Sequence, residues 1–137
     1  MKKIFLPLLL LGSTVIFAQN AQVQLSFQRD YPDRRDVQWV QTNDQWHAHY
    51  RDDRNRDMDV YYDNYGNRRD THIGWDRRDV PRNVDNRINR RYHPNGEYRV
   101  ERIERPSYRP LFQIRIGTKS PVYMDDRGRR RRYDDNH

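Results

Sequence analysis

The stretch VYYDNYGNRR spans Val60–Arg69, and a closely similar stretch, VYMDDRGRRR, spans Val122–Arg131. The two lie 62 residues apart and share Val, Tyr, Asp, Gly and two Arg at matching positions. An Asp followed three residues later by Gly is typical of a tight turn, because Asp accepts backbone N–H groups and Gly takes a positive φ. We therefore interpret each stretch as a strand, a hairpin turn and the next strand. A calcium loop is not expected, since its alternating oxygen ligands and closing Glu are absent from both stretches.

An amphipathic pattern typical of a helix precedes each stretch. Val84, Ile88 and Tyr92 stand four residues apart, and 61 residues earlier so do Val23, Phe27 and Tyr31. Before the second pattern, Asp79 followed by Val80-Pro81 predicts a helix start with Asp as the cap. The first helix has no obvious cap and should fray at its N-terminal end.

Short runs with alternating apolar residues follow each helix, separated by Asn, Asp, Gly and Pro. This order predicts an α+β fold, a tandem repeat of one helix followed by about four antiparallel strands, with the helices packed on one face of the sheet. We assign residues 19–75 to the first repeat, 76–133 to the second and 134–137 to a polar tail. The expected strands centre on Val37–Trp39, Trp46–Tyr50, Met58–Tyr62, Thr71–Trp75, Tyr98–Val100, Phe112–Ile116, Val122–Met124 and the arginine run Arg129–Arg132.

The N-terminal residues 1–18 are typical of a signal peptide: MKK, then an apolar run, then Ala18 at the expected cleavage position. We therefore expect a periplasmic or secreted protein without a stable membrane anchor after cleavage. The chain has no cysteine, which excludes disulfides and thiolate metal sites. Leu, Ile, Val and Phe are sparse, but ten Tyr and three Trp supply apolar area for a small core.

Catalytic chemistry finds little support in the residues. No serine stands in a nucleophile elbow, and most Asp residues neighbour an Arg, which lowers a carboxyl pKa and opposes a poised general acid. His47 and His49 would point to one face of a strand, a spacing that two metal-binding imidazoles can use. His72 shares that outward phase but is expected two strands away. We therefore expect no catalytic residue, metal or cofactor. Metal-dependent hydrolysis at the two histidines is a third hypothesis, after the two binding functions described below.

Several local patterns carry a family resemblance: the sequences YPD at Tyr31–Asp33, VQW at Val37–Trp39 and WHAHY at Trp46–Tyr50, with the two repeated stretches above. Over residues 23–132 the chain resembles secreted PepSY-like proteins, also described as beta-lactamase-inhibitor-like and common in Bacteroidota. The resemblance implies a non-enzymatic envelope protein that binds an unknown protein partner through its sheet face and loops. Such binding would modulate or inhibit a peptidase or another envelope enzyme. The chain departs from the family in its many arginines and its short first helix.

The predicted outward sheet face supplies the candidate binding residues, which are His47, His49, Asp59, Tyr61 and Tyr123. Exposed tyrosines are good interface anchors, and they are equally common strand residues without a partner. The alternative site is the arginine run Arg129, Arg130, Arg131 and Arg132, which would bind a polyanion such as lipopolysaccharide phosphates or acidic glycans. The same run also suits a solvated edge strand. Export and the interspersed Asp residues argue against nucleic acid as a partner.

Overall fold

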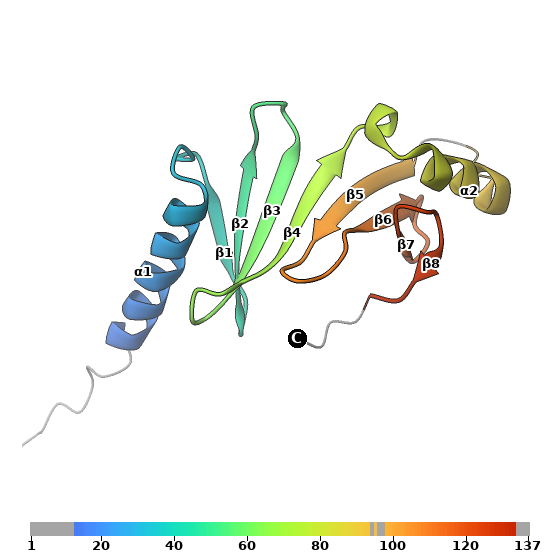
Figure 1. The fold of residues 1–137 in the computed structure, drawn as a ribbon. Helices are drawn as coiled ribbons and strands as arrows, with labels where there is room; N and C mark the ends of the chain where they lie inside the picture. The colour runs from blue at the N-terminus through green and yellow to red at the C-terminus, as the bar shows by residue number, and fades with distance from the viewer. Residues whose placement is uncertain (1–12, 94, 96–97, 134–137) are drawn as a thin grey trace, which may run out of the picture.

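In a computed structural model, residues 13–93, 95 and 98–133 are described, and within them the chain forms one antiparallel sheet with helices before each set of four strands. The sheet has eight strands in the order of the sequence, β1 to β8 (Figure 1). The predicted polar tail and the first twelve residues of the predicted signal peptide lie outside the described residues. The elements are α1 (Ser13–Asp30), β1 (Gln38–Gln41), β2 (Gln45–Arg51), β3 (Asp57–Asp63), β4 (Arg68–Trp75), the 3-10 helix η1 (Arg77–Asp79), α2 (Arg82–Tyr92), β5 (Tyr98–Glu104), β6 (Leu111–Ile116), β7 (Val122–Met124) and β8 (Arg130–Arg131).

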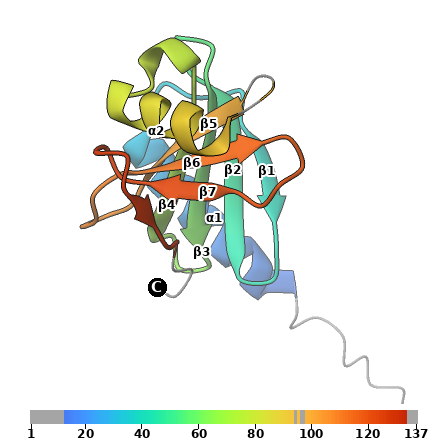
Figure 2. The same cartoon turned by 90° about the vertical axis from the view of Figure 1, so that its right-hand side faces the viewer.

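Both helices cover the same face of the sheet. Val23 and Phe27 of α1 pack with the buried residues of β2, β3 and β4, and Val84 and Ile88 of α2 pack with those of β5, β6 and β7. Trp75 contacts both clusters, and its register partner is Val100 of β5, so the two clusters share one face. Figures 1 and 2 show α1 beside the first strands and α2 beside β5 and β6. The predicted alternation and the placement of the helices on one face are confirmed.

Aromatic side chains fill the first cluster where aliphatic residues are few. The ring of Phe27 lies 5.0 Å from Tyr31, 5.3 Å from Trp39, 5.7 Å from Tyr50 and 6.4 Å from Tyr62, measured between centroids. Most of these pairs meet edge to face, an arrangement that the ring quadrupoles favour. A sequence poor in Leu and Ile therefore still builds a core.

The two repeated stretches form matching hairpin turns. The Gly66 amide donates to the Asp63 carbonyl at 3.1 Å, and the Gly128 amide donates to the Asp125 carbonyl at 2.9 Å. Both glycines have positive φ, 82° and 73°. Oδ1 of each Asp accepts two backbone amides of its turn, from residues 65 and 67 in the first and 127 and 129 in the second. The turn interpretation of the opening stretches is confirmed.

Each turn also presses against a helix. A Cβ atom on Gly66 would lie 2.8 Å from Oγ of Ser26 in α1, and one on Gly128 would lie 2.7 Å from the carbonyl oxygen of Asn83 in α2. Glycine is therefore required at both positions for its φ and for the close approach of the helix.

The helix ends differ from the prediction in three respects. Asp79 does not cap α2: it ends η1, and Pro81 occupies the cap position without a side-chain hydrogen bond. Tyr31 lies just beyond the end of α1 at Asp30. The helix α1 begins at Ser13, before the predicted cleavage point, so cleavage after Ala18 would leave residues 19–30 of it. None of the helices among the described residues has the length and apolar character needed to span a membrane.

Candidate functional site on the outer sheet face

A continuous row of polar and aromatic side chains crosses the sheet face that the helices leave uncovered. Each strand from β2 to β7 contributes at least one member, and neighbours along the row contact one another. We call this set the outer-face row; it comprises His47, His49, Asp59, Tyr61, His72, Glu101, Gln113 and Tyr123. All five predicted partner-binding residues therefore lie in one row, although their role in binding stays a prediction.

Three of the predicted residues form a tight cluster at one end of the row. Oδ1 of Asp59 lies 2.6 Å from Nε2 of His47 and 2.7 Å from Nδ1 of His49. The antiparallel register places Asp59 directly opposite His49 and Tyr61 directly opposite His47. The ring of Tyr61 stacks on His47 at 4.7 Å, with 9° between the planes. The strand register thus brings together side chains that are ten to twelve residues apart in sequence.

The middle of the row continues through hydrogen bonds. His72 meets Tyr61 edge to face at 5.1 Å, and its Nδ1 lies 3.4 Å from a carboxylate oxygen of Glu101. Burial, followed by the nearby carboxylates of Asp59, Glu101 and Asp70, raises the pKa of Tyr61 to about 12. The Tyr61 hydroxyl is therefore protonated at neutral pH and available as a hydrogen-bond donor.

Tyr123 lies at the far end of the row, on β7, four strands from Tyr61 on β3. Its hydroxyl lies 3.1 Å from the side-chain amide of Gln113, and its ring stacks on Tyr133 at 5.1 Å. Tyr123 does not meet the histidine cluster directly. It belongs to the same surface through the intervening residues of the row.

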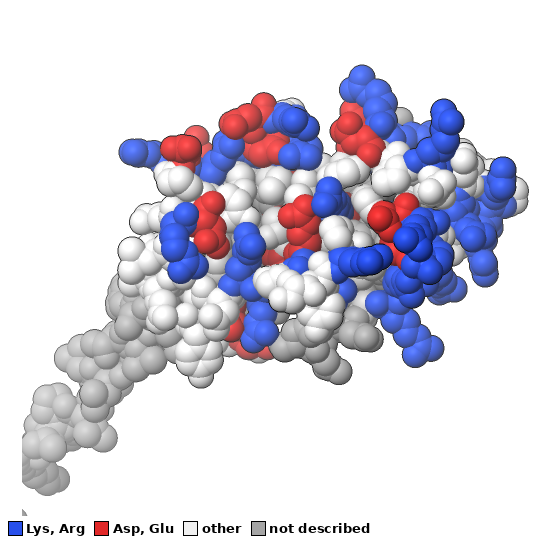
Figure 3. Space-filling view, in the orientation of Figure 1, with Lys and Arg blue, Asp and Glu red and all other residues white. Residues whose placement is uncertain are grey.

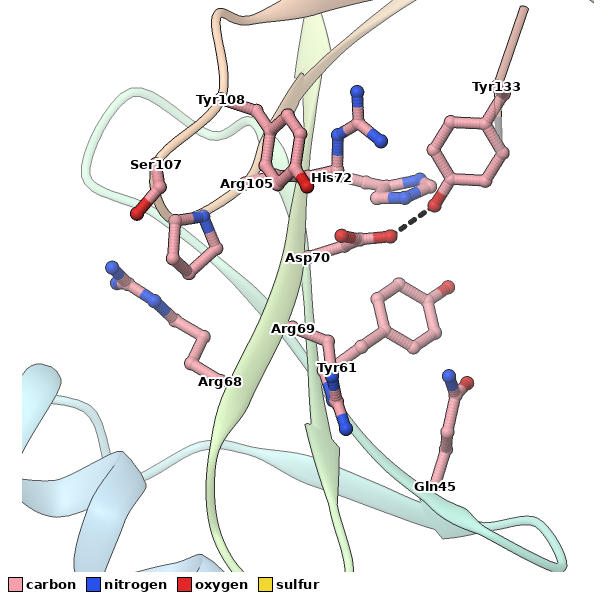
Figure 4. Close-up of a pocket in the computed structure, with 11 residues that line it drawn as sticks. Gln45, Tyr61, Arg68, Arg69, Asp70, His72, Arg105, Ser107, Tyr108 and Tyr133 are labelled. Carbon is pink, nitrogen blue, oxygen red and sulfur yellow. Dashed lines mark hydrogen bonds between the residues drawn. The ribbon is translucent and has the colours of Figure 1, made fainter. Parts of the chain in front are cut away.

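A pocket of about 550 Å³ opens beside the middle of the row. Tyr133, which follows β8, donates a hydrogen bond to the carboxylate of Asp70 on β4, so the chain returns across the outer face to close one wall (Figure 4). The guanidinium of Arg105 lies 4.9 Å from the ring of Tyr108 and 5.4 Å from that of Tyr133. The lining residues are Gln45, Tyr61, Arg68, Arg69, Asp70, His72, Arg105, Pro106, Ser107, Tyr108 and Tyr133.

Sequence reasoning missed most of this pocket. Strand phase predicts Tyr61 for this face, but it gives no role to Arg105 and Tyr108, which lie in the connection between β5 and β6. No local pattern predicts Tyr133, because its contact with Asp70 joins residues 63 apart in the chain. The one local signal was the RPSYRP sequence of residues 105–110, which places two arginines and a tyrosine in a loop.

Part of the positive charge of the arginine run is neutralised by a buried carboxylate. Oδ2 of the buried Asp125 lies 2.9 Å from Nε of Arg129 and 2.9 Å from a terminal nitrogen of Arg131. Burial by itself would raise the pKa of Asp125, but backbone and side-chain hydrogen bonds from Arg129, with others from Arg131 and Arg127, hold it below its usual value. The strand β8 is only two residues long, and all four arginines of the run are exposed.

Charge is nevertheless distributed unevenly between the two halves. Residues 19–75 carry eight Arg and ten Asp, a net charge of −2, whereas residues 76–133 carry 17 basic and eight acidic residues, a net charge of +9. Figure 3 shows basic side chains gathered at the end of the molecule that holds α2, β7 and β8. A hollow of about 260 Å³ there is lined by Arg105, Arg109, Arg129, Arg131 and Arg132 together with five other residues.

The fold is that of several solved Bacteroides proteins, although the sequence matches no family model and no curated protein. A protein described as periplasmic from Bacteroides eggerthii is similar with a TM-score of 0.74 and 19% identity, over 81% of this chain and 84% of that one. A DUF2874 family protein from Bacteroides uniformis gives 0.74 and 18%, over 82% and 86%. A BLIP-like protein from Bacteroides fragilis gives 0.66 and 20%, over 85% and 90%.

At these identities the likeness establishes the fold alone. The chain therefore has a BLIP-like α+β architecture built mostly of sheet. The inhibitor-like fold that the sequence resemblance implied is confirmed at this level. Membership of the PepSY-like family stays a prediction.

Proposed function

We propose that this chain is a non-enzymatic binding module of the bacterial envelope that holds a protein partner against its outer sheet face. The observation that carries the proposal is the outer-face row with its adjoining pocket. The helices cover the opposite face, so the outer face is the broad surface on which rigid strands display aromatic and polar side chains together. Aromatic and arginine side chains of this kind dominate the energetics of protein interfaces.

The lining of the pocket indicates the chemistry of the partner. Arg105 contributes a guanidinium group over the rings of Tyr108 and Tyr133, and Tyr61 and Tyr108 contribute aromatic rings. Arg68 and Arg69 also line the pocket, but Arg68 donates to the Tyr31 hydroxyl and Arg69 pairs with Asp63. Guanidinium groups pair with carboxylates in forked geometry, and rings accept planar apolar groups. We therefore expect the partner to insert a loop with an acidic side chain next to an apolar or aromatic one. An enzyme partner, such as a peptidase that would be inhibited or modulated, is favoured by the BLIP-like fold.

Site-specific photo-crosslinking tests the surface in living cells. A photoreactive phenylalanine replaces Tyr108 at the pocket, and the control replaces Tyr65 on the β3–β4 turn beside α1. Both tyrosines are exposed, 54% and 73%, so neither substitution disturbs the core. We expect a defined crosslinked species from position 108 that Arg105→Glu abolishes and Arg54→Glu leaves intact, because Arg105 lies over the pocket tyrosines. Equal crosslinking from both positions, or insensitivity to Arg105→Glu, would refute the assigned surface.

The envelope location and the repeat belong to the same proposal. A periplasmic site is supported by the predicted signal peptide and by the similar protein described as periplasmic. Duplication of one helix-plus-four-strand unit is supported by the matching turns at Asp63–Gly66 and Asp125–Gly128 and by their matching helix contacts. An experimental structure whose two halves did not superpose would contradict the duplication.

A second candidate function, polyanion binding, is favoured by the net charge of +9 in residues 76–133 and by the arginine-lined hollow. Elution from immobilised heparin by salt tests it, because electrostatic binding weakens as ionic strength rises. We expect the double variant Arg130→Ala, Arg132→Ala to elute at clearly lower salt. The double variant Arg35→Ala, Arg54→Ala carries the same change in charge in the first half and is the matched control. If the salt concentration of elution fell equally in the two variants, heparin would be responding to net charge and not to a polyanion site at the arginine run.

A further inference from the structure

The histidine cluster at the end of the outer-face row has the composition of a metal site. One ligand atom from each of His47, His49 and Asp59 can be chosen so that all three lie within 4.8 Å of one another. The side chains are partly exposed, 26%, 36% and 23% respectively, so an ion can reach them from solvent. From the sequence alone, the third outward histidine is His72, and its strand lies two strands from β2, too far to complete a site. The structure supplies Asp59 in its place.

The scaffold holds these donors on rigid elements. His47 and His49 are two residues apart on β2, with buried Ala48 between them, so both point to the outer face. Asp59 stands opposite His49 on β3 and points to the same face. The stacked ring of Tyr61 restricts rotation of the His47 imidazole. Sites built on strands hold their ligands more accurately than sites on loops.

The charge environment distinguishes Asp59 from most other carboxylates that organise this chain. Asp52, Asp63 and Asp125 are each held by arginines, whereas within residues 13–93, 95 and 98–133 the ion pairs of Asp59 are with the two histidines. An arginine on the carboxylate would repel a cation and occupy its lone pairs. The chain is rich in arginine, yet this cluster places imidazole nitrogens around a carboxylate.

We propose that His47, His49 and Asp59 bind one divalent transition-metal ion, with zinc as the ion that best fits two imidazoles and a carboxylate. Imidazole donors favour zinc, copper or nickel over calcium and magnesium, which prefer oxygen ligands. The ligand atoms are Nε2 of His47, Nδ1 of His49 and a carboxylate oxygen of Asp59. Three protein ligands leave a tetrahedral ion with one position directed at solvent or at a bound partner.

Only small movements separate the observed cluster from a metal site. Zinc–ligand bonds of about 2.0–2.2 Å require neighbouring ligand atoms to stand roughly 3.3 Å apart in tetrahedral geometry. The present hydrogen bonds hold them at 2.6 and 2.7 Å. Each of these two histidine–carboxylate distances must therefore grow by less than about 1 Å. The two imidazole nitrogens, which lie within 4.8 Å of each other, must come to about the same 3.3 Å, and small side-chain adjustments of His49 and Asp59 supply these movements. With the ion bound, the ligating nitrogen of each imidazole faces it with a lone pair, and any ring proton stands on the other nitrogen.

Equilibrium dialysis of the purified mature chain, prepared without a histidine tag, against zinc followed by metal analysis tests the proposal. We expect the wild type to bind one zinc per chain, and His49→Ala and Asp59→Asn to lose it. Loss of a residue that only supports a metal ligand lowers metal affinity by roughly 10–100-fold, so loss of a ligand itself should lower the zinc affinity by more than that. His72→Ala removes an outward histidine outside the cluster, and it should bind zinc like the wild type. Cobalt gives a second readout, since a tetrahedral site develops visible absorption that the two cluster variants lack.

Three results would overturn the proposal: no zinc retained by the wild type, retention in both cluster variants, or equal loss in His72→Ala. Circular dichroism of each variant separates loss of ligands from loss of fold. The inference does not depend on the proposed function. The crosslinking experiment at Tyr108 needs no metal, so either proposal can fail while the other stands.

Discussion

Substitution of Gly128 by Ala tests the contact between the second repeated turn and α2. Gly128 has φ +73°, and an added Cβ would lie 2.7 Å from the backbone carbonyl oxygen of Asn83. An alanine at positive φ costs about 1–2 kcal/mol, and overpacking against an element that cannot rotate away adds about 1–3 kcal/mol. We therefore expect Gly128→Ala to lower the free energy of unfolding by about 3 kcal/mol.

Two other glycines separate these contributions. Gly117 has φ +55° with nothing within 4 Å of the added Cβ, so Gly117→Ala measures the backbone strain alone, about 1–2 kcal/mol. An added Cβ at Gly66 would lie 2.8 Å from Oγ of Ser26, a side-chain atom that can rotate, and 3.2 Å from the carbonyl oxygen of Gln22. Gly66→Ala should therefore lie between the other two, and adding Ser26→Ala should recover part of its loss.

Urea unfolding followed by circular dichroism measures the series. With a slope of about 1.5 kcal/mol per molar urea, the midpoint should fall by roughly 2 M for Gly128→Ala and roughly 1 M for Gly117→Ala. If Gly128→Ala and Gly117→Ala were equally destabilised, the turn would not press on α2 and the reasoning about the repeated stretch would be wrong. An unchanged slope confirms that the variants unfold from the same native state.

Three further predictions concern acid stability, the core and processing. Asp125 has a lowered pKa when folded, so its contribution to stability is complete above the ordinary Asp value of 3.8 and is lost as the pH falls through the lowered value. Asp125→Asn should therefore be less stable at pH 7 and lose less between pH 4 and pH 2 in urea titrations; parallel curves for variant and wild type would contradict this. Phe27→Ala should cost about 3–5 kcal/mol of unfolding free energy, because it empties the centre of the aromatic cluster, and exposed Leu25→Ala, 66% accessible in the wild type, is the control. Mass spectrometry of the exported protein should give Gln19 as its first residue, and retention of residues 1–18 would refute the cleavage prediction.

Local sequence was sufficient for the elements whose signals are short-range. The alternation in Trp46–Tyr50 and Met58–Tyr62, and the Asp and Gly of each turn, predicted strands and hairpins correctly, because these signals act within a few residues. The start of α2 was misplaced, because Asp79 is also a good end for a 3-10 turn and local propensity does not separate the two.

The sequence predicted which residues belong to the candidate site, but it did not predict which of their side chains contact one another. His47, His49, Asp59, Tyr61 and Tyr123 could be assigned to the outward face from strand phase alone. That Asp59 would stand between the two histidines depends on the register of β2 against β3. A shift of one residue in that register would have turned Asp59 to the other face.

The amino-acid sequence by itself determined which segments are helices, strands and turns, and which side chains point toward the helices, because periodicity and turn chemistry are local properties. Only the tertiary structure decided that Tyr133 returns to Asp70 to close a pocket, that Asp125 neutralises part of the arginine run, and that two histidines share one carboxylate. These contacts join strands through register and sheet curvature, which arise from packing the whole sheet and are not encoded in any single stretch of the chain.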